Sequence, residues 1–230
     1  MSATRTGPAA AGPPGGYAVR GATTVLLVRH GATAHTAERR LSGCTGADPE
    51  LSVTGRRQAE LLAAALRERG GVDVLLTSPV RRARQTAEAV AGALGLPLGV
   101  EDDLREIDFG SWEGLTEAEV ERGWPGALPA WRQDAAAVAP GGESVLQVAA
   151  RVAGVRERLL AAHEGATIAV VSHMYPVKLW ITDALQVPPQ VVQRMHVDPT
   201  GVAEIATTPP GDPRGPWLLL RHNDTGHLRA

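Results

Sequence analysis

The chain of 230 residues has little cysteine and no excess of either charge. Its single cysteine, Cys44, cannot form a disulfide within the chain or build a cysteine-based zinc site. Basic and acidic residues number 23 and 25, so no strong overall field attracts nucleic acid or an anionic membrane. No stretch approaches the roughly 20 apolar residues needed to cross a bilayer. The sequence therefore favours a globular protein, and we expect neither nucleic acid nor a membrane as its partner.

Aromatic side chains are also scarce, with five tryptophans, two tyrosines and one phenylalanine. Valine, leucine, isoleucine and alanine must then fill the core, and close packing of such side chains favours helices layered on a sheet. Residues 1–22 are rich in glycine, proline and alanine, so we predict a disordered N-terminal tail and one domain over 23–230. Because the tail lacks the continuous apolar segment of a secretory signal, we expect a cytoplasmic protein.

Short β-branched or leucine-rich runs alternate with helical segments from Thr24 onward. This alternation predicts a three-layer α/β/α fold around a mostly parallel sheet. The last two apolar runs are separated by the turn-forming residues PPGDPRG, which predicts a hairpin and one antiparallel edge strand. The expected strands begin near Thr24 and cover 73–78, 98–101, 167–172, 202–208 and 216–222. The expected helices cover 54–69, 81–94 and 145–163, the last with Ser144 as its N-cap.

The strongest chemical signal lies where the first strand ends, at Arg29, His30 and Gly31. The carboxyl end of a parallel strand is where open α/β sheets place ligand sites. An arginine offers a forked, permanently charged donor to phosphate oxygens, and a glycine lets backbone amides approach an anion. A strand end with two polar residues and a turn glycine would look the same in isolation, so the interpretation depends on the residues that accompany it.

Two further segments bring matching residue types to the same edge of the sheet. Arg81, Arg82 and Arg84 open the helix after the second strand, where the helix start already attracts anions, so cations there suggest a bound anion. A solvated basic face explains Arg81 and Arg84 equally well. The buried run TIAVVS is followed by His173, a second imidazole. The two histidines and the arginines together predict a phosphate-binding site.

The sequence resembles the histidine phosphatase superfamily, the phosphoglycerate-mutase-like enzymes, from about Val25 to the C-terminus. Arg29-His30-Gly31 matches the family's signature, and SPVRRARQTAE, LREIDFGSWEG, PGGES and VVSHMYPVK match later motifs in the right order. The residues that fall at familiar offsets are Arg40, Gly43, Leu51, Ser52 and Gly55. Among relatives, the chain looks most similar to phosphatase domains fused to ribonuclease H in actinobacteria, and next to α-ribazole phosphatases.

The resemblance implies a metal-independent phosphomonoesterase that needs no cofactor and acts on a small phosphorylated metabolite. His30 would attack phosphorus and form a phosphohistidine, and Glu106 would protonate the leaving group and later activate water. Histidine suits this role because its ordinary pKa is about 6.5. The groups implied to hold the phosphoryl oxygens are Arg29, Arg82, His173 and the hydroxyl of Thr36. Those implied to contact the rest of the substrate are Arg40, Met174 and Tyr175.

Several alternatives stay open at this level. Asp108 or Glu113 could share or replace the proton-donor role of Glu106. A phosphoglycerate mutase is the first alternative function, although the 67 positions between Glu106 and His173 look short for the segment that closes a mutase site. A non-catalytic module that binds a phosphorylated ligand is the alternative of another class. The sequence does not identify the substrate or the pathway, nor does it decide between a monomer and a homodimer. The histidines that lack the spacing of a metal site are His35, His163, His196, His222 and His227.

Overall fold

The structure is a computed structural model that describes residues 21–229. The predicted N-terminal tail therefore lies almost entirely outside the described residues, and the boundary at residue 23 stays a prediction. The strands are β1 Thr24–Arg29, β2 Val74–Thr77, β3 Leu98–Val100, β4 Thr167–Ser172, β5 Val202–Thr207 and β6 Trp217–Asp224. The α-helices are α1 Ala34–Glu38, α2 Val53–Arg69, α3 Arg81–Leu94, α4 Glu117–Gly123, α5 Ala127–Gln133, α6 Val145–Ala162 and α7 Met174–Ala184. None of the described helices is long and apolar enough to cross a membrane.

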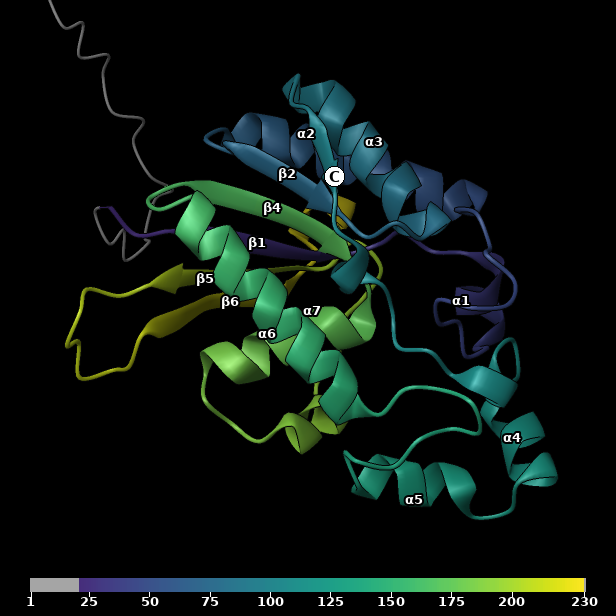
Figure 1. The fold of residues 1–230 in the computed structure, drawn as a ribbon. Coiled ribbons are helices and arrows are strands. Elements are labelled where there is room, and N and C mark those ends of the chain that lie inside the picture. The colour runs from purple at the N-terminus through teal and green to yellow at the C-terminus, as the bar shows by residue number, and fades with distance from the viewer. Residues whose placement is uncertain (1–20, 230) are drawn as a thin grey trace, which may run out of the picture.

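The strands form one sheet in the order β3-β2-β4-β1-β5-β6. Strands β3, β2, β4 and β1 run parallel, whereas β5 pairs antiparallel with both β1 and β6. Helices α2 and α3 cover one face and α6 and α7 the other (Figure 1). The predicted three-layer α/β/α fold is confirmed, with the antiparallel strand β5 one position inside the edge that β6 forms. The parallel strands end at a common edge, beyond which α1, α4 and α5 gather (Figure 1).

The central strands are buried on both faces, which explains why they read as continuous apolar runs. Along β1, Val25 and Leu27 belong to the core under α6 and α7, and Leu26 and Val28 to the core under α2 and α3. All four side chains are at most 1% exposed. Burying an aliphatic side chain of this size contributes about 1.5–3 kcal/mol. The strand that leads to His30 is therefore fixed from both sides.

The element boundaries agree with the expected ones to within two residues where a cap or turn residue marks them. Ser144 accepts a hydrogen bond from the Gln147 N–H and completes a capping box at the start of α6. Gly95 ends α3 in the left-handed conformation, with a φ of 66°. The middle of the chain, where the sequence predicts no helix or strand between residues 101 and 145, contains α4 and α5. These helices have seven residues each, too few for a hydrophobic period to show in the sequence.

Two glycines let the loop after β1 pass close to the first turn of α2. A Cβ on Gly55 would lie 1.9 Å from the carbonyl oxygen of Ala32, and a Cβ on Gly31 would lie 2.6 Å from the carbonyl oxygen of Gly55. Both obstacles are backbone atoms, so they cannot rotate away as a side chain could. The loop next to His30 therefore requires glycine at both positions.

We predict that Gly55→Ala lowers the free energy of unfolding by about 1–3 kcal/mol, the usual cost of overpacking. Urea unfolding measures the change. Gly92→Ala is the matched control, because a Cβ on Gly92 in α3 meets no described atom within 4 Å. Alanine there should stabilise the helix by up to about 1 kcal/mol. Equal effects of the two substitutions would contradict the proposed close approach.

Candidate active site

Three neighbouring strands end at one place and bring the predicted residues together. His30 follows β1, His173 follows β4, and Arg82 lies in the first turn of α3, which follows β2. Because β4 lies between β1 and β2, these side chains meet at the carboxyl edge of the sheet. The ring centroids of His30 and His173 are 5.1 Å apart. Arg82 Nε donates to His30 Nε2 at 3.1 Å.

The hydrogen-bond partners of His30 fix its tautomer. The side chain is buried, and Nδ1 lies 2.7 Å from the carbonyl oxygen of Gly31. A carbonyl oxygen can only accept, so Nδ1 carries the proton and Nε2 offers its lone pair to Arg82. Burial, followed by the nearby charges of Arg82 and Arg29, holds the pKa of His30 well below its ordinary value. The ring is therefore a neutral imidazole with an unprotonated Nε2.

Arg82 places a positive charge deep in the site. Its side chain is 1% exposed, and Nη2 donates to the carbonyl oxygens of Ser42 and Gly43 at 2.9 and 2.8 Å. Burial lowers the pKa of Arg82, yet a guanidinium stays charged in proteins. Nη1 has no hydrogen-bond partner within residues 21–229. The site thus contains a buried cation that still has one hydrogen-bond donor, Nη1, available to a ligand.

Arg29 and His173 contribute further donors of the same kind. Arg29 Nη1 donates to the carbonyl oxygen of Val197 at 2.7 Å, and Nε of the same side chain has no described partner. His173 Nε2 lies 2.7 Å from Ser78 Oγ, whereas its buried Nδ1 has no partner in the described part of the chain. Burial, then the charge of Arg82, holds the pKa of His173 well below its ordinary value. This arrangement suits the binding of an anion.

Ser78 determines which nitrogen of His173 can face an anion. The Val80 N–H donates to Ser78 Oγ at 3.2 Å, so the hydroxyl proton is free to go to His173 Nε2. In that arrangement, His173 Nδ1 carries the proton of the neutral ring. His173 can therefore donate a hydrogen bond without carrying a charge.

Glu106 lies at the N-terminus of α7. Its Oε2 accepts from the Met174 N–H at 3.0 Å, and its Oε1 accepts from the Tyr175 and Ile107 N–H groups at 3.1 and 3.0 Å. Burial raises the pKa of Glu106, although these amides and the charge of Arg82 favour the ionised form. A raised pKa is what a carboxyl group needs in order to give up a proton near neutral pH.

The two other candidate carboxylates serve the loops around the site. Glu113 accepts from two backbone N–H groups at 2.8 and 3.2 Å, and Asp108 accepts from a hydroxyl and an N–H group, both at 2.7 Å. Neither lines the cavity next to His30, whereas Glu106 does. Among the three carboxylates, the geometry favours Glu106 as the proton donor.

A cavity of about 80 Å³ opens beside His30. The predicted residues that line it are Arg29, His30, Thr36, Arg40, Glu106 and Met174, joined by Thr33, Leu41, Ser42 and Phe109. Arg82 and His173 are not among the lining residues, although both lie next to His30. The hydroxyl of Thr36 accepts from the Thr33 N–H at 3.2 Å and belongs to the capping box of α1, so it is less free than expected. No group of three or more histidine, cysteine, aspartate or glutamate residues among those described could hold a metal ion.

Tyr175 differs from its expected role at the pocket wall. Its side chain is 5% exposed and packs against Phe109 and Trp131, with ring centroids 6.1 and 5.7 Å apart. Only its backbone N–H reaches the site, where it donates to Glu106. Successive residues on a helix point about 100° apart, so Met174 lines the cavity while Tyr175 turns into the core.

Several supporting residues were not predicted from the sequence. Thr86 Oγ1 accepts from the Gly31 N–H at 3.0 Å. The N–H expected to meet an anion is therefore engaged, and the glycine is required by the approach of Gly55. Arg151 donates to the carbonyl oxygen of Glu106 at 3.0 Å and supports its loop. Contacts of this kind join residues at least 45 positions apart, so no local pattern marks them.

The segment 197–201 holds Arg29 in place. The Thr200 N–H donates to the carbonyl oxygen of Arg29 at 2.9 Å, and the carbonyl oxygen of Gly201 accepts from the Arg29 N–H at 3.3 Å. The carbonyl oxygen of Val197 receives the guanidinium. Both the backbone and the side chain of Arg29 thus depend on this one segment.

Asn223, the only asparagine of the chain, fixes that segment through Asp198. Its Oδ1 accepts from the Asp198 N–H at 2.7 Å and its Nδ2 donates to the Asp198 carboxylate at 2.8 Å. Asn223 has a φ of 53°, a left-handed conformation in which asparagine is enriched. It therefore couples the end of β6 to Arg29.

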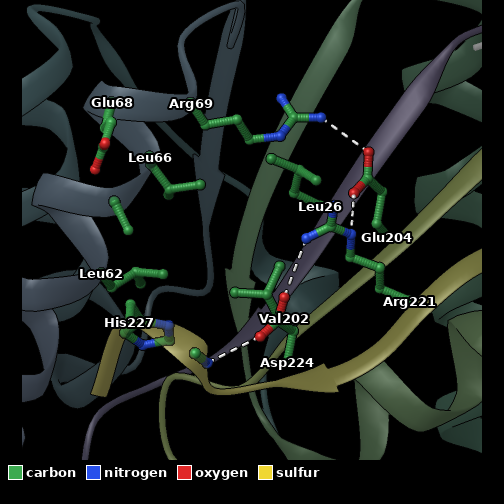
Figure 2. A pocket seen from close by; sticks show the side chains of 12 residues that line it. Leu26, Leu62, Leu66, Glu68, Arg69, Val202, Glu204, Arg221, Asp224 and His227 are labelled. Carbon is green, nitrogen blue, oxygen red and sulfur yellow. Dashed lines mark hydrogen bonds and ion pairs between the residues drawn. The ribbon is translucent and has the colours of Figure 1, made fainter. Parts of the chain in front are cut away.

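Strand β6 is itself tied to α2 by a chain of ion pairs. Arg69 of α2 contacts Glu204 of β5 at 2.8 Å, Glu204 contacts Arg221 of β6 at 3.5 Å, and Arg221 contacts Asp224 at 3.2 Å. These side chains form one wall of a cavity of about 340 Å³ (Figure 2). The chain of ion pairs holds the strand end that carries Asn223.

Comparison with known proteins agrees with this geometry. The histidine phosphatase superfamily (branch 1) matches residues 25–225, so the chain belongs to this superfamily, as its motifs predicted. It is 43% identical over 186 residues to a bifunctional protein of Mycobacterium tuberculosis, covering 80% of this chain and 50% of that protein. It therefore spans about half the length of that relative.

This chain covers a larger share of two further relatives. Phosphoserine phosphatase 1 of Hydrogenobacter thermophilus is 37% identical over 155 residues, covering 67% of this chain and 72% of that protein. The structure of a mycobacterial glucosyl-3-phosphoglycerate phosphatase matches with a TM-score of 0.80 and 29% identity, over 89% of this chain and 100% of that chain. The fold thus extends over nearly the whole described chain.

We predict that Asn223→Ala weakens the binding of inorganic phosphate about threefold to tenfold. Each lost hydrogen bond contributes about 0.5–1.5 kcal/mol, and part of that loss reaches Arg29 through the 197–201 segment. Isothermal titration calorimetry measures the affinity. Thr207→Ala is the control, because it removes a hydrogen bond to the Thr23 N–H at the opposite end of β5. Equal affinities in Asn223→Ala and the wild type would refute the coupling.

The lowered pKa of His30 predicts a pH-dependent contribution to stability. Below about pH 6.5 this histidine takes up a proton in the unfolded chain but not in the folded chain. The free energy of unfolding therefore decreases as the pH is lowered, by up to about 1.4 kcal/mol per pH unit. His30→Gln removes this contribution. The stability of the variant relative to the wild type should therefore rise between pH 7 and pH 5, measured by urea unfolding at each pH.

The control for this measurement is His196→Gln, because the side chain of His196 is 78% exposed. Glu106, with its raised pKa, acts in the opposite direction above its ordinary value of 4.5. It is present in both proteins, so its effect cancels in the comparison. Parallel stability curves for His30→Gln and the wild type would show that His30 titrates normally.

Proposed function

We propose that the chain hydrolyses phosphate monoesters of small metabolites through a phosphohistidine formed on His30. The observation that carries the proposal is the set of buried donors without partners in the described chain, Arg29 Nε, Arg82 Nη1 and His173 Nδ1. Buried donors are nearly always hydrogen-bonded in folded proteins. Two guanidiniums and a neutral imidazole around His30 match the charge and the oxygens of a phosphoryl group.

The first chemical step uses the lone pair of His30. Arg82 turns its donors to the phosphoryl oxygens, and the neutral Nε2 attacks phosphorus in line with the ester oxygen. The new N–P bond forms as the P–O bond to the alcohol breaks. Because Nδ1 holds its proton against the Gly31 carbonyl group, Nε2 needs no base to become nucleophilic.

Glu106 acts on both halves of the reaction. Its proton goes to the departing alkoxide, which leaves as the alcohol, and the carboxylate then removes a proton from the water that attacks the phosphohistidine. The N–P bond breaks, inorganic phosphate leaves, and His30 returns to its neutral form. The raised pKa of Glu106 supports the first half.

The relatives support hydrolysis over the alternatives. Two of them carry phosphatase names, for phosphoserine and for glucosyl-3-phosphoglycerate, and a phosphoglycerate mutase is less supported. The charges needed for phosphoryl transfer come from the chain's own arginines, so the proposal requires no metal or cofactor. A small phosphorylated metabolite is the proposed partner, and the cytoplasmic location and the choice between monomer and homodimer stay predictions.

The proposal predicts turnover of p-nitrophenyl phosphate in EDTA together with an acid-labile phosphoenzyme that His30→Ala abolishes. Glu106→Gln should slow an alkyl phosphate about 10²- to 10⁴-fold, the usual contribution of a general acid. The same variant should slow the formation of the phosphoenzyme from p-nitrophenyl phosphate far less, because nitrophenolate leaves without a proton, whereas hydrolysis of the phosphoenzyme should slow equally for both esters. Phosphate release and quenched-flow labelling measure these rates.

Each failure has a distinct meaning. Binding of phosphate esters without a phosphoenzyme would favour the non-catalytic module. Isomerisation of phosphoglycerate faster than phosphate release would favour the mutase. Equal losses of Glu106→Gln in the rate of phosphoenzyme formation from both esters would assign Glu106 a structural role.

A further inference from the structure

We propose that the site selects phosphate monoesters of uncharged alcohols over those of hydroxy acids, an inference that rests on the proposed phosphatase activity. The reacting phosphoryl group is the same in both classes. Selection must therefore come from the mouth of the cavity, where the rest of the substrate lies.

The mouth offers apolar surface and hydroxyl groups. Leu41, Phe109 and Met174 supply the apolar part of the lining. Thr33, Thr36 and Ser42 also line it, but the hydroxyls of Thr33 and Thr36 bond each other at 3.2 Å. Ser42 Oγ is buried and has no partner in the described chain, so it is available to a neutral polar group of the substrate.

The positive charge at the mouth is already offset. Arg40 Nε donates to Glu38 Oε2 at 2.6 Å, and Arg40 Nη1 donates to Glu119 Oε2 at 3.0 Å and to the carbonyl oxygen of Gly114 at 2.9 Å. Two carboxylates thus face one guanidinium, which leaves this side of the mouth with a net negative charge. The N–H and hydroxyl of Thr116 also bond Glu119 and lower its pKa, so its carboxyl group stays ionised.

The other cations near the site are not placed to receive a carboxylate. Arg29 is the one further arginine among the described residues that line the cavity, and the proposed mechanism commits it to the phosphoryl oxygens. Lys178 does not line the cavity. Its side chain is 6% exposed, and its Nζ lies 5.7 Å from the centroid of the Tyr175 ring.

Glu38 and Glu119 do not line the cavity themselves, but both contact Arg40, which does. A carboxylate on the substrate would therefore find Arg40 already paired and would be repelled by the two carboxylates behind it. Repulsion between like charges, together with the loss of the carboxylate's water, disfavours such a substrate. An uncharged alcohol suffers neither penalty. The relatives named for phosphoserine and glucosyl-3-phosphoglycerate carry names of carboxylate-bearing esters, so the proposal separates this chain from them.

The test compares glycerol 3-phosphate with 3-phosphoglycerate, which differ in a hydroxymethyl group against a carboxylate. We expect the wild type to show at least about fivefold higher kcat/KM on glycerol 3-phosphate. Glu38→Gln with Glu119→Gln should raise the relative kcat/KM on 3-phosphoglycerate about threefold to tenfold, because the double variant removes both repelling charges and leaves Arg40 free to attract the carboxylate. Glu38→Gln alone, at an exposed helix end, should give part of this change without risk to folding.

Two controls separate local charge from general effects. Glu60→Gln removes an exposed carboxylate that pairs with Arg57 on α2 and should leave the ratio of the two substrates unchanged. Arg40→Gln should move the ratio further toward glycerol 3-phosphate, because it leaves both carboxylates without their cation. Higher salt should narrow the preference of the wild type by screening these charges.

The outcomes distinguish this inference from the proposed function. Turnover of p-nitrophenyl phosphate with equal or better use of 3-phosphoglycerate by the wild type would overturn the inference alone. An unchanged ratio in the double variant would overturn it as well. No turnover of any of the three esters would overturn the proposed function and the inference together.

Discussion

The burial of the Arg82 guanidinium against His30 is the constraint on which the site depends. A charge buried this deeply without a carboxylate in contact is costly. Two backbone carbonyl groups accept hydrogen bonds from the guanidinium and offset part of this cost. Burial, and then repulsion by the charge of Arg82, keeps His30 neutral. The same cation thus favours an anionic ligand and leaves Nε2 unprotonated, the two conditions that phosphoryl transfer to histidine requires.

The buried charge of Arg82 also acts on Glu106, where it favours the charged form of the side chain and not the neutral one. Burial favours its neutral form, whereas the Ile107 amide, the charge of Arg82 and the Tyr175 amide favour the carboxylate. When a phosphate anion binds to Arg82, part of that cation's influence on Glu106 is cancelled and a negative charge is added nearby. Both changes raise the affinity of Glu106 for a proton. In the proposed mechanism, substrate binding therefore favours the protonated form of the group that protonates the leaving oxygen.

The sequence predicts the parts of the site that sit on strand ends and helix starts. His30, Arg82 and His173 follow parallel strands that are neighbours in the sheet, so topology alone brings them to one edge. Tyr175 shows the limit, because a motif places it beside His173 but only the helical turn decides which face it takes. Asn223 shows another, because it reaches Arg29 through a loop distant in sequence, and that contact follows from tertiary packing alone.

The proposed chemistry and the proposed selectivity belong to different parts of the chain. The groups proposed to bind the phosphoryl oxygens lie at the ends of β1 and β4 and on α3, held by strands that are buried on both faces. The charges at the mouth sit on α1 and α4, two short helices beyond the edge of the sheet (Figure 1). Changing Glu38 or Glu119 disturbs no core contact, whereas changing Arg82 alters the charge that sets His30. The leaving group that such a fold accepts can therefore vary while the reaction stays the same.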